Sequence, residues 1–195
     1  MKYITDILSA KLLTLNLITE AQLPVFNYGL EVLISSFINI LTILCCSCLF
    51  NTVFHGIVFL IIFVPLRVTL GGYHAKTRTK CFIISVLLYG ITSKLQVALS
   101  GILLNSIVWI TLLTILSIYI LLSKPIDNIH HPINQSKKHK NKSLSVNFIF
   151  FDFVVCFIGI LSFPNSSLMQ FSILSILAFA LLHFISGRRC LYGIL

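Results

Sequence analysis

The feature that most constrains the fold of this chain is a series of long apolar runs separated by short polar connections. An α-helix needs about 20 consecutive apolar residues to cross the hydrocarbon core of a bilayer. Runs close to this length occupy residues 27–50, 53–70, 81–98, 101–123, 144–163 and 166–187. The sequence therefore predicts an all-α membrane protein with six transmembrane helices.

The amino-acid composition supports the same fold class. Of the 195 residues, 57% are hydrophobic and 10% are charged, and the mean hydropathy is +1.02. Average soluble domains carry about 25% charged residues. The chain lacks the polar side chains that would cover a water-soluble domain of this size, so we expect residues 1–195 to form a single polytopic membrane domain without internal repeats.

The segment 3–23 has a different pattern and is expected to lie along the membrane surface. Its apolar side chains recur at three- and four-residue spacing, which is typical of an amphipathic helix. Polar residues such as Asp6, Lys11 and Glu20 interrupt this segment too often for a transmembrane span. Pro24 is expected to end the helix.

The distribution of cations predicts the orientation of the chain in the membrane. The net charge of +9 arises from 14 Lys and Arg against 5 Asp and Glu. The cations gather in the segments 67–80 and 124–143 and near both termini, and Lys94 is the exception. The positive-inside rule therefore places both termini, and the basic loop 124–143, in the cytoplasm. No aromatic stacking surface accompanies the cations, so no nucleic-acid partner is expected.

The cysteines and loop histidines do not form a metal or disulfide pattern. Cys45, Cys46 and Cys48 have no second cluster at metal-ligand spacing, and we interpret them as small apolar helix residues. His130 and His131 are adjacent but have no further ligands nearby in the sequence. We therefore expect neither a metal nor a cofactor.

The stretch from Arg67 to Cys81 carries the pattern with the most chemical content. An imidazole can take the proton of a thiol, and the resulting thiolate can attack a carbonyl, so His74 and Cys81 are a candidate nucleophilic pair. On one unbroken helix, their seven-residue separation would place them about 10.5 Å apart along the axis, too far for a hydrogen bond. A working pair thus requires a turn between them, and Gly71 and Gly72 supply backbone freedom beside His74.

The pattern R-x-x-x-G-G-x-H-A-x-x-x-x-x-C is filled by Arg67, Gly71, Gly72, His74, Ala75 and Cys81. It resembles the signature of the accessory gene regulator B (AgrB) family of bacterial quorum-sensing peptidases. The chain length, the amphipathic start, the apolar segments and the basic loops are also similar to that family. The resemblance covers most of the chain in architecture, and the stretch 67–81 in motif.

The resemblance implies a membrane cysteine endopeptidase, a thiol protease that acts at the cytoplasmic face of the bacterial cell membrane. Such enzymes remove the C-terminal tail of a short AgrD-like propeptide and hold the peptide as an acyl-enzyme thioester. A Cys or Ser of the peptide then displaces the enzyme and closes a thiolactone or lactone ring. By this resemblance Cys81 is the nucleophile, His74 is the general base, and a homodimer is expected.

Other ionisable residues leave alternatives open. Asp152 lies within an apolar run and is a candidate partner of His74 or Arg67, or an interhelical polar contact. Glu31 is a candidate partner of a cation or of the propeptide. Lysines of the basic loop face lipid headgroups or attract an acidic propeptide tail; these are Lys137, Lys138 and Lys140.

Two other classes of function compete with the peptidase hypothesis. A small transporter or peptide exporter would use Asp152, Glu31 and Lys94 along a membrane path. A non-catalytic membrane scaffold would need none of these residues. His55 and His183 are interpreted as packing histidines.

Overall fold

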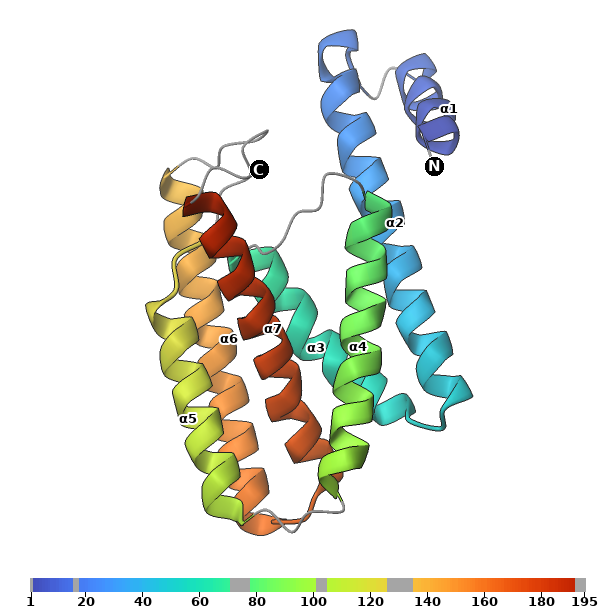
Figure 1. Cartoon of the computed structure of the whole chain (residues 1–195). Coiled ribbons are helices and arrows are strands. Elements are labelled where there is room, and N and C mark those ends of the chain that lie inside the picture. Colours follow the sequence, from blue (N-terminus) through green and yellow to red (C-terminus); the bar gives the residue numbers. More distant parts are fainter. Residues whose placement is uncertain (1, 16–17, 71–77, 101–104, 126–134, 192–195) are drawn as a thin grey trace. The chain divides into compact units, whose positions relative to one another are not determined.

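A computed structural model describes the chain except for residues 1, 16–17, 71–77, 101–104, 126–134 and 192–195. The described residues form seven α-helices and one short 3-10 helix, with no strand among them (Figure 1). These are α1 Lys2–Thr14, η1 Glu20–Gln22, α2 Leu23–Leu49, α3 Val53–Leu70, α4 Arg78–Ser100, α5 Ser106–Leu122, α6 Gln135–Ser162 and α7 Ser167–Leu191. The expected all-α class is confirmed.

Five of the helices are long and apolar enough to cross a membrane. Within the described part of the chain, these spans are Gly29–Leu49, Val53–Leu70, Phe82–Ser100, Lys138–Ser162 and Ser167–Gly187. Helix α5 is apolar but has only 17 residues, which corresponds to about 26 Å against a hydrocarbon core of about 30 Å. The expected span 101–123 begins in residues outside the described part, so the count of six spans stays a prediction.

The chain divides into two compact units, Met1–Ile43 and Leu44–Leu195. The first unit contains α1, η1 and most of α2. Helix α1 ends at Thr14, so it is shorter than the amphipathic helix that was expected over residues 3–23. Pro24 does not end a helix, as the sequence suggested, but is the second residue of α2. A proline is well tolerated there because the first N–H groups of a helix have no partner within it.

The exposed surface of α1 includes apolar side chains. Ile7 and Leu8 are exposed beside the charged Asp6 and Lys11, whereas Thr5 and Ser9 are buried. The Ser9 hydroxyl donates to the carbonyl of Thr5 at 2.9 Å, so its polar atom is satisfied within the helix. An exposed apolar face of this kind is suited to contact with lipid.

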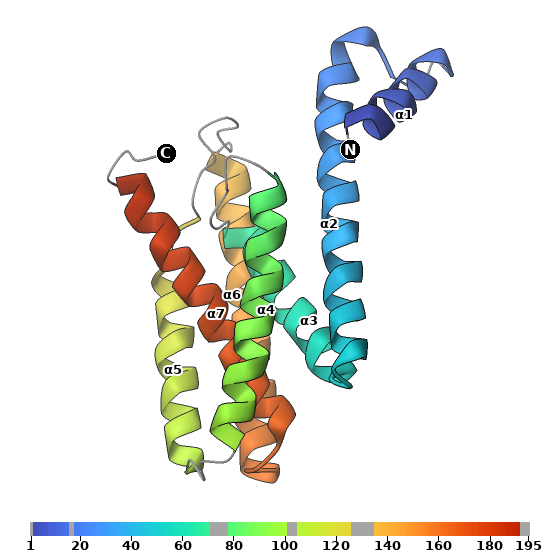
Figure 2. The same cartoon turned by 45° about the vertical axis from the view of Figure 1, so that its right-hand side comes forward.

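The second unit is organised around α7. This helix contacts α3, α4, α5 and α6, and Figure 2 shows it running beside α4, α5 and α6. Phe171, Ile173, Ile176 and Phe179 of α7 are fully buried. By contrast, side chains such as Leu87 and Ile91 of α4 are more than half exposed, as expected of a surface that faces lipid.

Helix α6 corrects the expected extent of the basic loop. The sequence placed residues 124–143 outside the span, but α6 begins at Gln135 rather than at residue 144. The run from Gln135 to Lys142 contains no Gly or Pro and is rich in Lys and Gln, which are good helix formers. The lysine-rich stretch therefore extends a transmembrane helix and is not an irregular loop.

Candidate active site

Cys81 is in the first turn of α4, which begins at Arg78. The preceding helix α3 ends at Leu70. His74, Gly71 and Gly72 lie outside the described residues, and the structure describes the backbone of Cys81 but not its side chain. The expected contact between His74 and Cys81 therefore stays a prediction.

Arg67 occupies the last turn of α3, and its contacts include a side chain of α4 and an aromatic ring of α3. Its Nη1 donates a hydrogen bond of 2.6 Å to Oγ of Ser85 on α4. Its guanidinium carbon lies 5.5 Å from the ring centroid of Phe63, one turn earlier on α3, within the range of a cation–π contact. Phe63 and Ser85 are both buried and Arg67 is half-buried, so the guanidinium is fixed against the packed side chains of α3 and α4.

The residue that receives this hydrogen bond is one helical turn from Cys81. Positions 81 and 85 are separated by four residues on α4 and so lie on the same face of that helix, about 6 Å apart along its axis. Arg67 is thereby attached to the turn next to the candidate nucleophile. The sequence motif included Arg67 but not Ser85; the i, i+4 spacing from Cys81 is the signal that could have identified it.

A second polar cluster joins the end of α5 to α6 and α7. Nζ of Lys142 donates to the carbonyls of Ile120, Leu121 and Ser123 at 3.1, 2.7 and 2.5 Å. The last carbonyls of a helix have no partner within it, and a cation near them also interacts favourably with the helix dipole. Lys142, which belongs to the predicted basic loop 124–143, therefore caps the end of α5.

His183 belongs to the same cluster. Its Nδ1 lies 3.1 Å from the hydroxyl of Tyr119, and its Nε2 lies 3.3 Å from the carbonyl of Lys124. Both ring nitrogens thus have partners, which confirms the interpretation of His183 as a packing histidine. His55 also packs against an aromatic ring, that of Phe171, with centroids 4.9 Å apart, although its Nε2 is buried with no hydrogen-bond partner among the described residues.

The remaining ionisable candidates are spread over the helices. Asp152 is half-buried on α6, and Lys94 is exposed on α4, about 20 Å along the axis from Cys81. Among the described residues no ion pair joins Asp152 to Arg67 or Lys94. Glu31 lies on α2 within the first unit.

The lysines assigned to substrate or lipid contact differ from one another. Lys140 is exposed and Lys138 is half-buried, both on the first turns of α6, whereas the side chain of Lys137 is outside the described part. The amine of Lys142 donates hydrogen bonds to carbonyls at the end of α5. The surface charge of this helix end therefore comes from only part of the lysine run.

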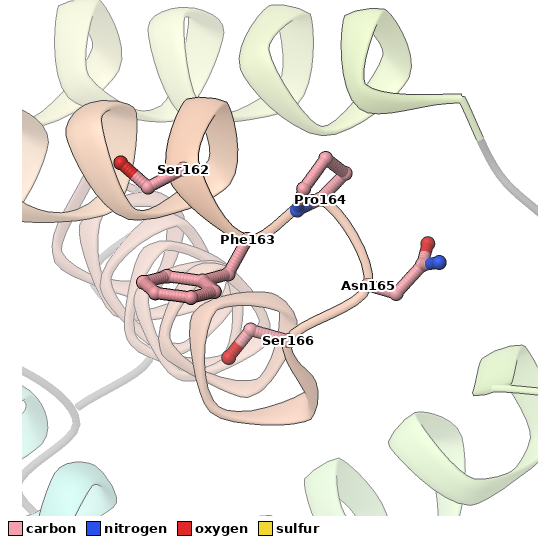
Figure 3. Close-up of a pocket in the computed structure, with 5 residues that line it drawn as sticks. All are labelled: Ser162, Phe163, Pro164, Asn165 and Ser166. Carbon is pink, nitrogen blue, oxygen red and sulfur yellow. The ribbon is translucent and has the colours of Figure 1, made fainter.

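A shallow depression at the turn between α6 and α7 does not provide an alternative site. Figure 3 shows its lining residues Ser162, Phe163, Pro164, Asn165 and Ser166, which enclose about 380 Å³. It contains no cysteine, histidine or carboxylate. In Figure 1 this turn lies at the end of the bundle where α4 finishes, whereas Cys81 is at the start of α4. In the part of the chain that the structure describes, no group of His, Cys, Asp or Glu has metal-binding geometry.

Several apolar helices with the length of a bilayer, packed around α7, define a multi-pass α-helical membrane protein. The family model of accessory gene regulator B matches residues 1–186, and the chain belongs to that family. Membership implies a role in quorum-sensing propeptide processing, with an AgrD-like propeptide as partner. No match is found among curated proteins or solved structures.

Proposed function

We propose that this protein is a cysteine endopeptidase that removes the C-terminal tail of a signal propeptide and cyclises the remaining peptide. Cys81 is the nucleophile and His74 is its general base. The observation that supports this assignment most directly is the bond between Arg67 and Ser85, because it attaches a fixed cation to the turn of α4 next to Cys81. Arg67, Cys81 and the intervening Gly-Gly and His all belong to the stretch whose pattern resembles the family signature.

The reaction has two acyl transfers. The imidazole of His74 takes the Sγ proton of Cys81, the thiolate attacks the scissile carbonyl, and negative charge develops on its oxygen. When the amide bond breaks, the released amine takes the proton from His74 and the peptide remains as a thioester. A Cys or Ser of the propeptide then attacks that thioester, forms a thiolactone or lactone, and returns the proton and the free thiol to Cys81.

The location at the end of a transmembrane helix favours cyclisation over hydrolysis. Exclusion of water from a reacting centre protects a reactive acyl intermediate. Cys81 lies immediately before the apolar window Phe82–Ser100, so the thioester would form at the edge of the bilayer. A propeptide lying on the membrane through its own amphipathic helix would present its cleavage site at this depth.

The side of the membrane and the oligomeric state are parts of the same proposal. The cations near residues 67–80 and 124–143 favour a cytoplasmic location for the start of α4 and the start of α6. Reporter fusions at residues 135 and 165 test this, with cytoplasmic signal expected at residue 135 and extracytoplasmic signal at residue 165. The reverse result would place Cys81 on the wrong face for a newly made propeptide. A homodimer and lipid contacts remain expectations drawn from the resemblance.

The decisive experiment uses the full chain in liposomes with its propeptide. Cys81→Ala should abolish both tail release and the covalent peptide adduct. Cys156→Ala is the matched control, since Cys156 is a buried cysteine of α6 outside the motif, and it should retain activity. Full cleavage by Cys81→Ala would exclude the mechanism. Retention of peptide transport by Cys81→Ser, with loss in Asp152→Asn or Lys94→Gln, would instead favour a transporter.

A further inference from the structure

The bond between Arg67 and Ser85 differs from the other serine and threonine contacts within the membrane helices. Serine and threonine in a helix commonly donate to a carbonyl three or four residues earlier. Thr92, Ser117 and Ser175 do so here, each within its own helix. The Ser85 oxygen accepts a hydrogen bond from a cation on another helix, and this contact joins α3 to α4.

This contact orients the guanidinium of Arg67, which is a half-buried residue. A cation among apolar side chains is disfavoured without polar partners, so its position follows them. Ser85 has no exposed surface, and the ring of Phe63 lies against the guanidinium on a second side. The hydrogen bond to Ser85 and the contact with the Phe63 ring both restrict rotation of the planar guanidinium, and they therefore constrain the directions of its N–H groups.

The direction matters because Ser85 lies one turn from Cys81 on the same face of α4. Negative charge develops on the scissile carbonyl oxygen, close to the attacking sulfur. Preorganised donors aimed at such an oxygen lower the barrier because they need no reorganisation during the reaction. A guanidinium tied to position 85 is held within reach of that region.

We propose that Ser85 is a positioning residue for the acylation step: its hydroxyl oxygen fixes the Arg67 guanidinium beside the turn that carries Cys81. The inference rests on the proposed function. It assigns to Ser85 no contact with the substrate, and its effect on the reaction passes entirely through Arg67.

The test compares two pairs of variants that differ only in the hydroxyl. Ser and Ala form the first pair at position 85, and Thr and Val form the second. Loss of one oxyanion donor costs about 10² to 10³ in rate, and a misplaced donor should cost less. We expect Ser85→Ala to lower the single-turnover acylation rate by about 10-fold, with the dissociation constant of the propeptide unchanged. Ser85→Thr should be more active than Ser85→Val.

Two controls separate positioning from a general disturbance of the bundle. Ser175→Ala removes an equally buried hydroxyl that donates only to the carbonyl of Phe171, and it should acylate at the wild-type rate. Ser85→Ala should lower the plateau of the pH–rate profile without moving its midpoint, because the His74–Cys81 pair is untouched. In an Arg67→Ala background, Ser85→Ala should lower the acylation rate by less than about a further 2-fold, because the effects of two residues that act through one interaction are not additive.

The results distinguish this inference from the proposed function. Wild-type acylation by Ser85→Ala, or full additivity with Arg67→Ala, would overturn the positioning role while leaving Cys81 as nucleophile. Full cleavage by Cys81→Ala would instead remove the reaction on which the inference rests. If Ser85→Ala fails to accumulate in the membrane, the test relies on Ser85→Thr and Ser85→Val. Equal acylation rates of these two variants would refute the proposal.

Discussion

Two polar clusters at helix ends of the second unit use their cations in different ways. Lys142 donates to three backbone carbonyls at the end of α5, whereas Arg67 bonds to a side chain, Ser85, and stacks on Phe63. The first arrangement satisfies carbonyls that the end of every helix leaves without partners. The second arrangement uses side chains rather than backbone carbonyls, and it fixes the direction of the Arg67 guanidinium. We infer that Lys142 stabilises the fold, whereas Arg67 contributes to the proposed acylation reaction.

The two clusters are connected through aromatic rings. Phe63, under Arg67, lies 6.3 Å from Phe179, and Phe179 lies 5.9 Å from the ring of His183. This packed row joins α3 to α7. A disturbance of one cluster can therefore reach the other, so both the reaction rate and thermal unfolding should be measured for variants of either cluster.

The largest effect is expected at His74, beside the Arg67 cluster in sequence. His74→Ala should lower the cleavage rate by about 10² to 10⁴, the usual range for loss of a general base. Activity of the unaltered protein should survive a strong chelator, because the proposed role of His74 is to accept a proton. Loss of activity with chelator and its recovery with zinc would contradict this role. Thermal unfolding in detergent should be nearly unchanged.

Replacement of Arg67 by lysine should have the next largest effect. Lysine keeps the charge but lacks the planar fork that bonds to Ser85 and stacks on Phe63. We expect Arg67→Lys to lower the acylation rate by about 10-fold to 10²-fold, within the cost of losing an oriented donor. Lys94→Arg, a charge-conserving change at an exposed site on α4 far from Cys81, is the matched control. Equal activity of Arg67→Lys and the unaltered protein would show that charge alone suffices.

Removal of the Lys142 amine should produce the opposite pattern. Lys142→Met keeps an unbranched stem but leaves the α5 carbonyls without their donor, and hydrogen bonds to charged groups are worth about 1.5 to 3 kcal/mol each to stability. We expect a lower unfolding temperature in detergent and an acylation rate within about 2-fold of wild type in the folded fraction. Lys94→Met, at an exposed site on α4, is the control. A large decrease in the acylation rate without a decrease in stability would contradict the purely stabilising role of Lys142.

The smallest effect is expected at Tyr119. Tyr119→Phe removes one neutral hydrogen bond to His183 while keeping the ring, so the cost to stability should be about 0.5 to 1.5 kcal/mol. The acylation rate should not change. The measurement is thermal unfolding in the same detergent, read beside Lys142→Met. A destabilisation larger than that of Lys142→Met would show that the histidine, and not the lysine, holds this helix end.

Much of the fold follows from the sequence because bilayer thickness acts on helix length directly. The expected spans 53–70 and 166–187 differ from α3 and α7 by few residues, since in lipid the backbone groups of an apolar run of that length are satisfied only within a helix. The errors lie at the starts of two helices. Pro24 was expected to end a helix, but a proline is tolerated in the first turn of α2. The stretch 135–143 was expected to be a loop because it is polar, but it forms the start of α6.

The sequence by itself determined the membrane class, the segments that become helices, and the Arg67–Cys81 motif, because these depend on hydropathy and on the order of residues. Only the tertiary structure decided the partners of individual side chains. That Arg67 meets Ser85, that Lys142 caps α5, and that α7 lies at the centre all depend on how separate helices pack. The physical reason is that the membrane imposes helix formation locally, whereas the contacts between helices depend on side-chain shape and polar pairing between residues far apart in the chain.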